Sequence, residues 1–264
     1  MVKKGIKAED IKNLYEQGFN IAEIAEQLHC CSSNISHRLH KMGYTIVRDY
    51  SKTRFSRTNK HEIDLTFFEN IDNQDKAYFL GIMFSDGSVS DHQFYLKMKD
   101  EDVVLKFKEA LKCDYPIRFH DLPYTNYILE ISSKKMCNDL KKLGCVPNKT
   151  RILRFPIIKE NLIPHFIRGF FDGDGCLQLN DKLYHCRFDL TSASLDFLND
   201  IRPYITAIAK TNGSLNKEHN YNVWHLSYSG HQVIQILNWI YKGAHYYMQR
   251  KYFKYQLLSS HKTG

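Results

Sequence analysis

Asp86 and Asp174 are the residues whose types and surroundings most clearly predict chemistry. Each aspartate ends an apolar stretch and precedes a glycine, as expected for a helix C-terminus with a glycine cap. The helix dipole is negative at that end, which disfavours a carboxylate. Two carboxylates brought together there also repel each other. A divalent cation bound between them would relieve the repulsion. We therefore expect Asp86 and Asp174 to bind metal.

The helices that must position these aspartates carry small residues one turn apart. The first stretch has Gly81 and Ser85, and the second has Gly169 and Gly173 at the matching positions. Small residues four positions apart remove side-chain bulk from one helix stripe, so two such stripes can pack with their backbones close together. This packing would bring the two helix ends, and hence the two aspartates, side by side.

The two stretches, residues 79–87 and 167–175, resemble the LAGLIDADG signature of homing endonucleases. The positions that match this nine-residue pattern are Gly81, Asp86 and Gly87 in the first copy and Gly169, Asp172, Asp174 and Gly175 in the second. The copies depart from it at Phe84, which replaces the earlier acidic residue, and at Arg168, where a small residue is usual. Two diverged copies in one chain are a much more specific signal than a single Asp-Gly-Asp-Gly string.

The resemblance implies a DNA endonuclease in which the later aspartate of each copy is catalytic. It also implies that the backbone carbonyls of Ser85 and Gly173, which directly precede the aspartates, help to bind the metal. Hydrolysis of a phosphodiester needs an oriented water, a neutralised phosphate and help for the departing oxygen, and Mg²⁺ can supply all three. We expect Mg²⁺ as the cofactor, with Mn²⁺ able to replace it.

Family members also use a basic residue late in each repeat to stabilise the transition state. The candidates in this chain are Lys149 and Lys251. These lysines follow their aspartates at different distances along the chain, so the two positions do not match in sequence. Each could instead be a surface lysine or a lysine that contacts a phosphate.

Two other interpretations of the Asp-Gly sequences fit the chain less well. A single Asp-Gly at a helix end is commonly an ordinary turn, but its repetition in register after matched small residues is not explained that way. An EF-hand loop starting at Asp172 would need a third acidic position and a closing glutamate, and the sequence has neither.

The composition favours a globular protein with a polyanionic partner. The chain has 264 residues, 43% of them hydrophobic, and a formal net charge of +8, which favours nucleic acid as the partner. The resemblance implies that this partner is double-stranded DNA. The seven cysteines form no Cys-x-x-Cys pair, so we expect reduced thiols and no structural zinc. No apolar run is long enough to span a membrane, and no signal-peptide core follows the basic N-terminus. We expect a soluble intracellular protein of the cytoplasm, nucleoid or an organelle matrix, not a secreted one.

Residues 1–44 have the pattern of short helices around a small core. Asn20 and Glu23 have the spacing of a capping box at the start of the second helix. The arrangement looks like a helix-turn-helix. Its third helix would present four residues to a DNA major groove: Ser33, Asn34, His37 and Arg38. The alternative is a three-helix bundle that binds protein or only packs.

Residues 45–65 are rich in basic and small polar residues and show little apolar periodicity. Such a segment cannot bury a core, so we expect a linker that is extended in the absence of a partner. Its basic residues would follow phosphates or enter a minor groove, in particular Arg48, Lys52, Arg54 and Arg57. A basic linker that simply stays solvated is the alternative.

Residues 66–150 and 151–264 repeat one order of helices and strands. Alternating polarity predicts strands at 94–99, 117–120 and 127–132 in the first repeat, and at 176–180, 184–191, 214–217 and 222–228 in the second. Helical patterns precede, separate and follow the strand pairs. The predicted fold class is α+β, a duplicated αββαββα unit with a pseudo-twofold axis, preceded by a small all-α domain.

In the family that the chain resembles, the two sheets form a saddle over the DNA major groove. Strand alternation predicts eight side chains on that face: Tyr95, Lys97, Lys99, Arg118, His120, Gln178, Arg187 and Asp189. Each of these taken singly is more commonly a solvated strand residue. As a set on one face they favour DNA contact.

These observations predict a monomeric, Mg²⁺-dependent, site-specific endonuclease that acts on double-stranded DNA without an obligate protein partner. Members of the family are typically intron-encoded, intein-embedded or free-standing. One rival is a DNA-binding regulator that has lost cleavage, and the other is an RNA-splicing cofactor, for which RNA would be a partner. Both aspartates are present, which disfavours a pure DNA binder, because neighbouring carboxylates repel phosphate unless metal is bound.

Deleting residues 1–60 tests the predicted helix-turn-helix and linker. The loss of their basic residues should weaken DNA binding and lower its dependence on salt concentration, because fewer counterions are released. Mobility-shift titrations at several salt concentrations, together with footprinting, measure both effects. An unchanged footprint would show that this part of the chain does not read DNA.

Overall fold

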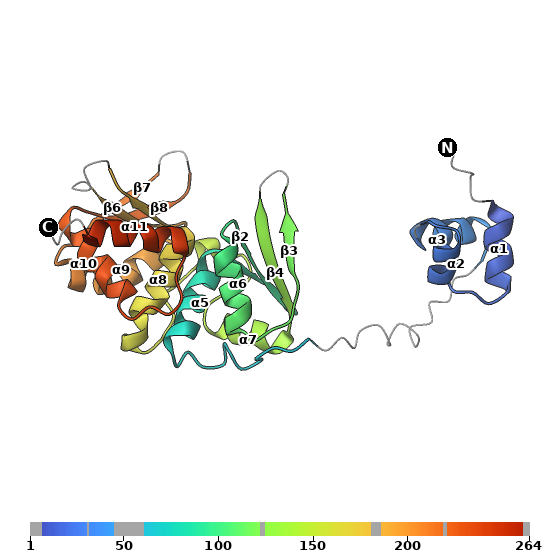
Figure 1. Ribbon diagram of the computed structural model, residues 1–264, viewed down its shortest axis with the longest axis horizontal. Coiled ribbons are helices and arrows are strands. Elements are labelled where there is room, and N and C mark those ends of the chain that lie inside the picture. The colour runs from blue at the N-terminus through green and yellow to red at the C-terminus, as the bar shows by residue number, and fades with distance from the viewer. Residues whose placement is uncertain are drawn as a thin grey trace. The chain divides into compact units, whose positions relative to one another are not determined.

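The computed structural model describes residues 7–30, 32–44, 61–121, 125–180, 186–218 and 221–260 (Figure 1). The chain divides into two compact units, residues 1–60 and 61–264. None of the helices within these described ranges is long and apolar enough to cross a membrane.

The first unit contains α1 (Ala8–Glu16), α2 (Ile21–Gln27) and α3 (Ser32–Lys41). Their apolar stripes meet in a small core made of Ile11, Ile24, Ala25, Ile35 and Leu39. The predicted capping box is present, because the Asn20 N–H donates to Glu23 Oε2 at 2.8 Å and the Glu23 N–H donates to Asn20 Oδ1 at 3.0 Å. The tight turn after α2 needs no glycine, since His29 adopts a left-handed φ of 49°.

The second unit repeats one order of elements. The first repeat consists of α5 (Gln74–Ser85), β1 (Gly87–Val89), β2 (Gln93–Met98), α6 (Glu101–Ala110), β3 (Ile117–His120), β4 (Asn126–Ser132) and α7 (Lys134–Lys142). The second consists of α8 (Ile163–Asp174), β5 (Gly175–Gln178), β6 (Arg187–Ser192), α9 (Leu195–Ala209), β7 (Ser214–Lys217), β8 (Trp224–Ser229), α10 (His231–Tyr241) and α11 (Gln249–Ser260). Short 3₁₀ helices, η2 (Lys149–Arg151) and η3 (Glu160–Leu162), lie between them. The predicted α+β duplication is confirmed.

Each repeat forms a four-stranded antiparallel sheet, and the strand orders β1-β2-β4-β3 and β5-β6-β8-β7 are the same. The strand that sequence analysis missed is β1, a three-residue segment that pairs with β2 directly after α5. In Figure 1, α5 and α8 lie adjacent near the middle of the unit, with β3 and β4 on one side and β6 to β8 on the other.

Helices α5 and α8 pack closely along what we call the α5–α8 seam. A Cβ atom added at Gly81 would lie 2.2 Å from the Phe166 carbonyl oxygen, and one at Gly169 would lie 2.0 Å from the Tyr78 carbonyl oxygen. The obstructing atoms belong to the backbones of packed helices, so they cannot move aside easily. The seam therefore requires glycine on both helices, as the small-residue spacing predicts.

The α5–α8 seam lies inside a hydrophobic core that the two repeats share. The ring of Phe84 on α5 packs against Phe166 of α8, with centroids 5.1 Å apart, and against Phe197 of α9 at 6.3 Å. All three side chains are buried. Because side chains of the first repeat fill space in the second, the two repeats form one folded unit.

Replacing Gly169 with alanine tests the seam. The added methyl group would overlap the Tyr78 carbonyl, and overpacking of this kind costs about 1–3 kcal/mol, occasionally more. We expect the free energy of unfolding, measured by urea denaturation, to fall by about 2 kcal/mol or more. Gln235→Ala, on the exposed side of α10, is the control and should change it by less than about 0.5 kcal/mol. Equal stability of the two variants would contradict the close approach of the helices.

Candidate functional site

The α5–α8 seam brings Asp86 and Asp174 together at one end of the two helices. Asp86 directly follows α5, and Asp174 is the last residue of α8. A Cβ atom added at Gly173 would lie 1.9 Å from Ser85 Oγ and 2.7 Å from Asp86 Oδ2, so the two helix ends touch. Two residues that are far apart in the sequence thus contribute to one acidic site.

Both carboxyl groups are harder to ionise than they would be in water. Loss of surrounding water raises the pKa of Asp86, and the nearby charges of Lys251 and Lys149 partly oppose this. The pKa of Asp174 is raised to about 7, first by loss of water and second by the negative charge of Asp86. The Asp174 side chain nevertheless keeps part of its surface exposed, so an ion can reach it. A cation at this site would stabilise both charged forms.

The available donors fit a hard cation such as Mg²⁺. In the parts of the chain that the structure describes, no group of three or more His, Cys, Asp or Glu side chains could hold a metal. Mg²⁺ does not need such a group, since it is commonly held by one or two carboxylates, with waters and phosphate oxygens completing its shell. The residues that would hold it are Asp86 and Asp174, with the backbone carbonyls of Ser85 and Gly173 as the further ligands that the sequence resemblance implies.

Lys149 and Lys251 occupy equivalent places beside the two aspartates. The Lys149 ammonium group donates a hydrogen bond to the carbonyl of Gly87, the residue after Asp86. The Lys251 ammonium group donates to the carbonyl of Gly175, the residue after Asp174, at 2.6 Å. The two lysines differ in their sequence offset because one lies on η2 and the other in the first turn of α11. Their shared position is visible only in the folded chain.

Both lysines are buried, with 8% of Lys149 and 3% of Lys251 exposed. The loss of water lowers the pKa of Lys251 to about 8. Besides Gly175, Lys251 donates to the carbonyls of Phe171 and Asp172 at 2.5 and 2.8 Å. A cation at this end of α8 is favourable, because these carbonyls form the negative end of the helix dipole.

The first sheet has a polar face that continues from Asp86 through β1. Lys97 and Arg118 lie opposite the same residue of β4 from its two sides, so they share a face. Strand alternation adds Tyr95 and His120 to that face, and all four side chains are exposed. Lys99 is also exposed and directly follows β2. The structure thus groups the residues of the first repeat that sequence analysis assigned to DNA contact.

The second sheet holds Gln178 and Arg187 as a directly opposed, exposed pair. Asp189 lies on the same face, but its carboxylate is buried and accepts hydrogen bonds from Arg187 Nε at 2.7 Å and from Ser227 Oγ. The alternating strand pattern predicts the sheet face on which Asp189 lies, but it does not indicate that neighbouring residues bury its carboxylate. DNA contact by Asp189 itself stays a prediction, which the burial of its carboxylate and its bonds to Arg187 and Ser227 disfavour.

The predicted readers of the first unit are only partly described. On α3, His37 is exposed, and the Asn34 side chain accepts a hydrogen bond from Arg38 Nε at 3.0 Å. Ser33 belongs to the same helix, but its side chain lies outside the described residues. The linker residues Arg48, Lys52, Arg54 and Arg57 also lie outside them. DNA reading by these residues stays a prediction.

A buried polar cluster on α8 was not predicted from the sequence. Arg168 and Asp172 are fully buried, and Tyr78 of α5 donates a hydrogen bond to Asp172 at 2.9 Å. Arg168 donates to His165 Nδ1 at 2.8 Å, and loss of water lowers the pKa of His165 to about 4, so the ring is neutral and can accept. The available signal was a pair of charged residues four positions apart inside an otherwise apolar helix.

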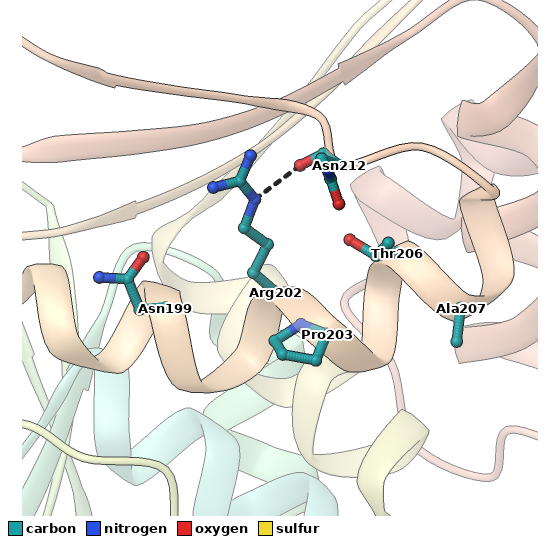
Figure 2. Close-up of a pocket in the computed structure, with 6 residues that line it drawn as sticks. All are labelled: Asn199, Arg202, Pro203, Thr206, Ala207 and Asn212. Carbon is teal, nitrogen blue, oxygen red and sulfur yellow. Dashed lines mark hydrogen bonds between the residues drawn. The ribbon is translucent and has the colours of Figure 1, made fainter.

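A shallow hollow lies along α9, and the described residues that line it are Asn199, Arg202, Pro203, Thr206, Ala207 and Asn212. Figure 2 shows Arg202 reaching across it, where Nε donates to the Asn212 carbonyl oxygen at 2.7 Å. These lining residues include no carboxylate, histidine or cysteine, so they offer no group suited to acid–base or metal chemistry. The aspartate pair at the end of the α5–α8 seam is therefore the better candidate for such chemistry.

The family model of the LAGLIDADG-like domain matches residues 162–237, which span α8 to α10 of the second repeat. The first repeat has the same element order and sheet topology. Among solved structures, the chain is similar to the I-LtrWI LAGLIDADG homing endonuclease bound to target DNA, with 12% identity and a TM-score of 0.48 over 76% of this chain and 92% of that one. It is also similar to the N-terminal LAGLIDADG domain of DUF199/WhiA, with 13% identity and a TM-score of 0.44 over 67% and 87% of the two chains.

Curated relatives match over shorter stretches. A reverse gyrase of Methanocaldococcus jannaschii is 32% identical over 147 residues, which are 54% of this chain and 8% of the relative. A probable translation initiation factor IF-2 of Thermococcus kodakarensis is 30% identical over 132 residues, which are 47% of this chain and 11% of the relative. The chain thus spans about a tenth of the length of these relatives.

The raised pKa of Asp174 makes stability depend on pH. In the unfolded chain this carboxyl ionises near its ordinary pKa of 3.8, whereas in the folded protein it ionises at about 7. Between these values the unfolded state releases its proton first, so the folded state loses stability as the pH rises. Asp174→Asn should therefore have a higher Tm than the wild type at pH 8 in EDTA, and the difference should shrink toward pH 4.

Thermal unfolding followed by circular dichroism at several pH values measures this difference. Adding Mg²⁺ at pH 8 should raise the Tm of the wild type, because bound metal stabilises the folded state, and should raise that of the variant less. Equal Tm values for the two proteins at pH 8 in EDTA would contradict the raised pKa.

Proposed function

We propose that the chain, whose residues 162–237 match the LAGLIDADG-like domain, is a site-specific, metal-dependent endonuclease that cleaves double-stranded DNA as a monomer. The observation that carries the proposal is the meeting of Asp86 and Asp174 at one end of the α5–α8 seam, with a buried lysine beside each. Like charges held this close together are unfavourable unless a cation binds there. A protein that only packed or bound neutral surfaces would gain nothing from this arrangement.

The residues of the chain have separate tasks in this reaction. Asp86 and Asp174, one aspartate from each repeat, would hold the metal, and Mg²⁺ bound there would supply an activated water and neutralise phosphate charge. The lysines keep a positive charge next to each aspartate, where negative charge grows in the transition state. The exposed basic side chains of the first sheet, Lys97 and Arg118, would contact the DNA backbone or base edges, and Arg118 would exchange its ion pair with Glu130 for this contact.

The first unit and the linker extend the contact with DNA in this proposal. The helices α1 to α3 form a compact module with its own core, and the linker that follows it is rich in basic residues. A second binding module on the same chain raises affinity without a new active site.

Substitution of the two aspartates tests the proposal. The substrate is a pool of supercoiled plasmids that carry random inserts, together with a plasmid that carries the DNA flanking the gene, with any intron removed. Asp86→Asn should abolish cleavage of at least one strand, a loss of about 100-fold or more, by analogy with removal of one transition-state donor. Binding measured in Ca²⁺ should be unchanged, and the double variant Asp86→Asn, Asp174→Asn should cut neither strand.

Gln235→Ala, remote from the seam on the exposed side of α10, is the control and should cleave as the wild type does. Equal cleavage by the double variant and the wild type would remove the proposed mechanism. A wild-type protein that binds DNA in Ca²⁺ and leaves both strands intact in Mg²⁺ and in Mn²⁺ would overturn the proposal in favour of a non-cleaving regulator.

A further inference from the structure

Asp172 is a fully buried carboxylate whose hydrogen bonds lead away from its own helix. Its oxygens accept from Tyr78 OH at 2.9 Å, from Tyr241 OH at 3.3 Å and from the backbone N–H of Met248 at 2.8 Å. A buried carboxylate without partners is costly, so these bonds are required for the packing of this region. Through them Asp172 joins α8 to α5, to the end of α10 and to the residue directly before α11.

The first turn of α11 is held by carboxylates from both repeats. Asp172 accepts from Met248, and Asp102 of α6 accepts from the next backbone N–H, that of Gln249, at 3.1 Å. Asp100 then binds the side chain of Arg250 through two hydrogen bonds of 2.7 and 3.1 Å. Carboxylates at a helix N-terminus satisfy free N–H groups and interact favourably with the helix dipole. The position at which α11 begins is thereby fixed.

Lys251 lies in the same turn, so the position of its ammonium group depends on the position of that turn. Its ammonium group reaches back to the carbonyls of Phe171, Asp172 and Gly175 at the end of α8, beside Asp174. Asp172 therefore contacts the start of α11 twice. Its side chain accepts a hydrogen bond from the Met248 N–H, and its backbone carbonyl accepts one from Lys251.

The first repeat lacks this arrangement. Its residue at the position of Asp172 is Phe84, whose ring packs in the apolar core, and its residue at the position of Arg168 is Leu80. Lys149 lies on the short η2 helix and is not linked to α5 by a buried carboxylate at that position. The two halves of the site thus hold their lysines by different means.

We propose that Asp172 is a positioning residue, which holds the start of α11 so that Lys251 stays at the end of α8 beside Asp174. For its catalytic consequence this inference rests on the proposed nuclease function. The consequence is that cleavage of the two DNA strands depends on different residues. The half of the site with Asp174 requires Asp172 for cleavage of its strand, and the half with Asp86 does not.

Lysine labelling of the whole protein tests the positioning without any need for cleavage. Reductive methylation with formaldehyde and cyanoborohydride, followed by peptide mass spectrometry, measures how fast each lysine is modified. In Asp172→Ala the Met248 N–H loses its acceptor, and Lys251 should be modified at least about tenfold faster than in the wild type, because its local opening becomes easier. Asp172→Asn keeps an acceptor oxygen and should restore most of the protection. Lys149 should react at the wild-type rate in both variants.

Phe84→Ala is the matched control, because it disrupts the corresponding position of the first repeat and opens a larger cavity. It should destabilise the protein yet leave Lys251 protected. Should Asp172→Ala fail to fold, Asp172→Leu, which fills the space without an acceptor, takes its place. Protection of Lys251 in a folded Asp172→Ala or Asp172→Leu variant, or equal release of Lys251 in Phe84→Ala, would overturn the inference.

Strand-resolved cleavage measures the consequence. The strand cut by the second half is identified as the one that Asp174→Asn spares. Asp172→Ala should slow cleavage of that strand by about tenfold or more, because small displacements of a catalytic group have large effects on rate, and nicked DNA should accumulate. Equal slowing of both strands would contradict the proposal. A wild type that cuts neither strand would refute the nuclease function alone, and the labelling would still decide the role of Asp172.

Discussion

The contact of two helix backbones at Gly81 and Gly169 is the constraint on which the second unit depends. Because an added Cβ would meet backbone oxygens about 2 Å away, the distance between α5 and α8 is fixed by the absence of side chains and not by their size. Fixing that distance also fixes where the helices end relative to each other. The strands β1 and β5 start directly after those ends, so the position of both sheets follows from the same contact.

The same contact creates the electrostatic problem that the site must solve. The C-terminal ends of two helices and two carboxyl groups meet in one place, and the helix dipoles and the carboxylates are all negative there. Lys149 and Lys251 compensate for part of this charge by donating to the carbonyls next to the aspartates. The pKa of Asp174 is nevertheless raised to about 7, first by loss of surrounding water and second by the negative charge of Asp86. In the proposed function, a divalent ion bound between the two aspartates would offset both effects.

The sequence predicted the parts of this arrangement that depend on local pattern. The strands, the duplicated order and the glycine stripes all follow from spacing along the chain, and the structure has them near the predicted positions. Other features depend on neighbours that are distant in sequence. The strand β1 is short and exists through its pairing with β2, Asp189 is buried because Ser227 and Arg187 close over it, and the matching of Lys149 with Lys251 appears only when η2 and α11 are placed.

The two repeats illustrate how a duplicated site can diverge while its centre stays the same. Phe84 and Asp172 occupy equivalent positions, and both fill the space beside the seam, one by apolar packing and the other by hydrogen bonding. Apolar packing tolerates small shifts, because its energy changes gradually with distance, whereas a buried carboxylate requires its donors in place. The second repeat therefore has a sharper requirement for the geometry of its C-terminal segment than the first. Its helix α11 is tied to Asp100 and Asp102 of the other repeat, so that the lysine of one half is positioned by both.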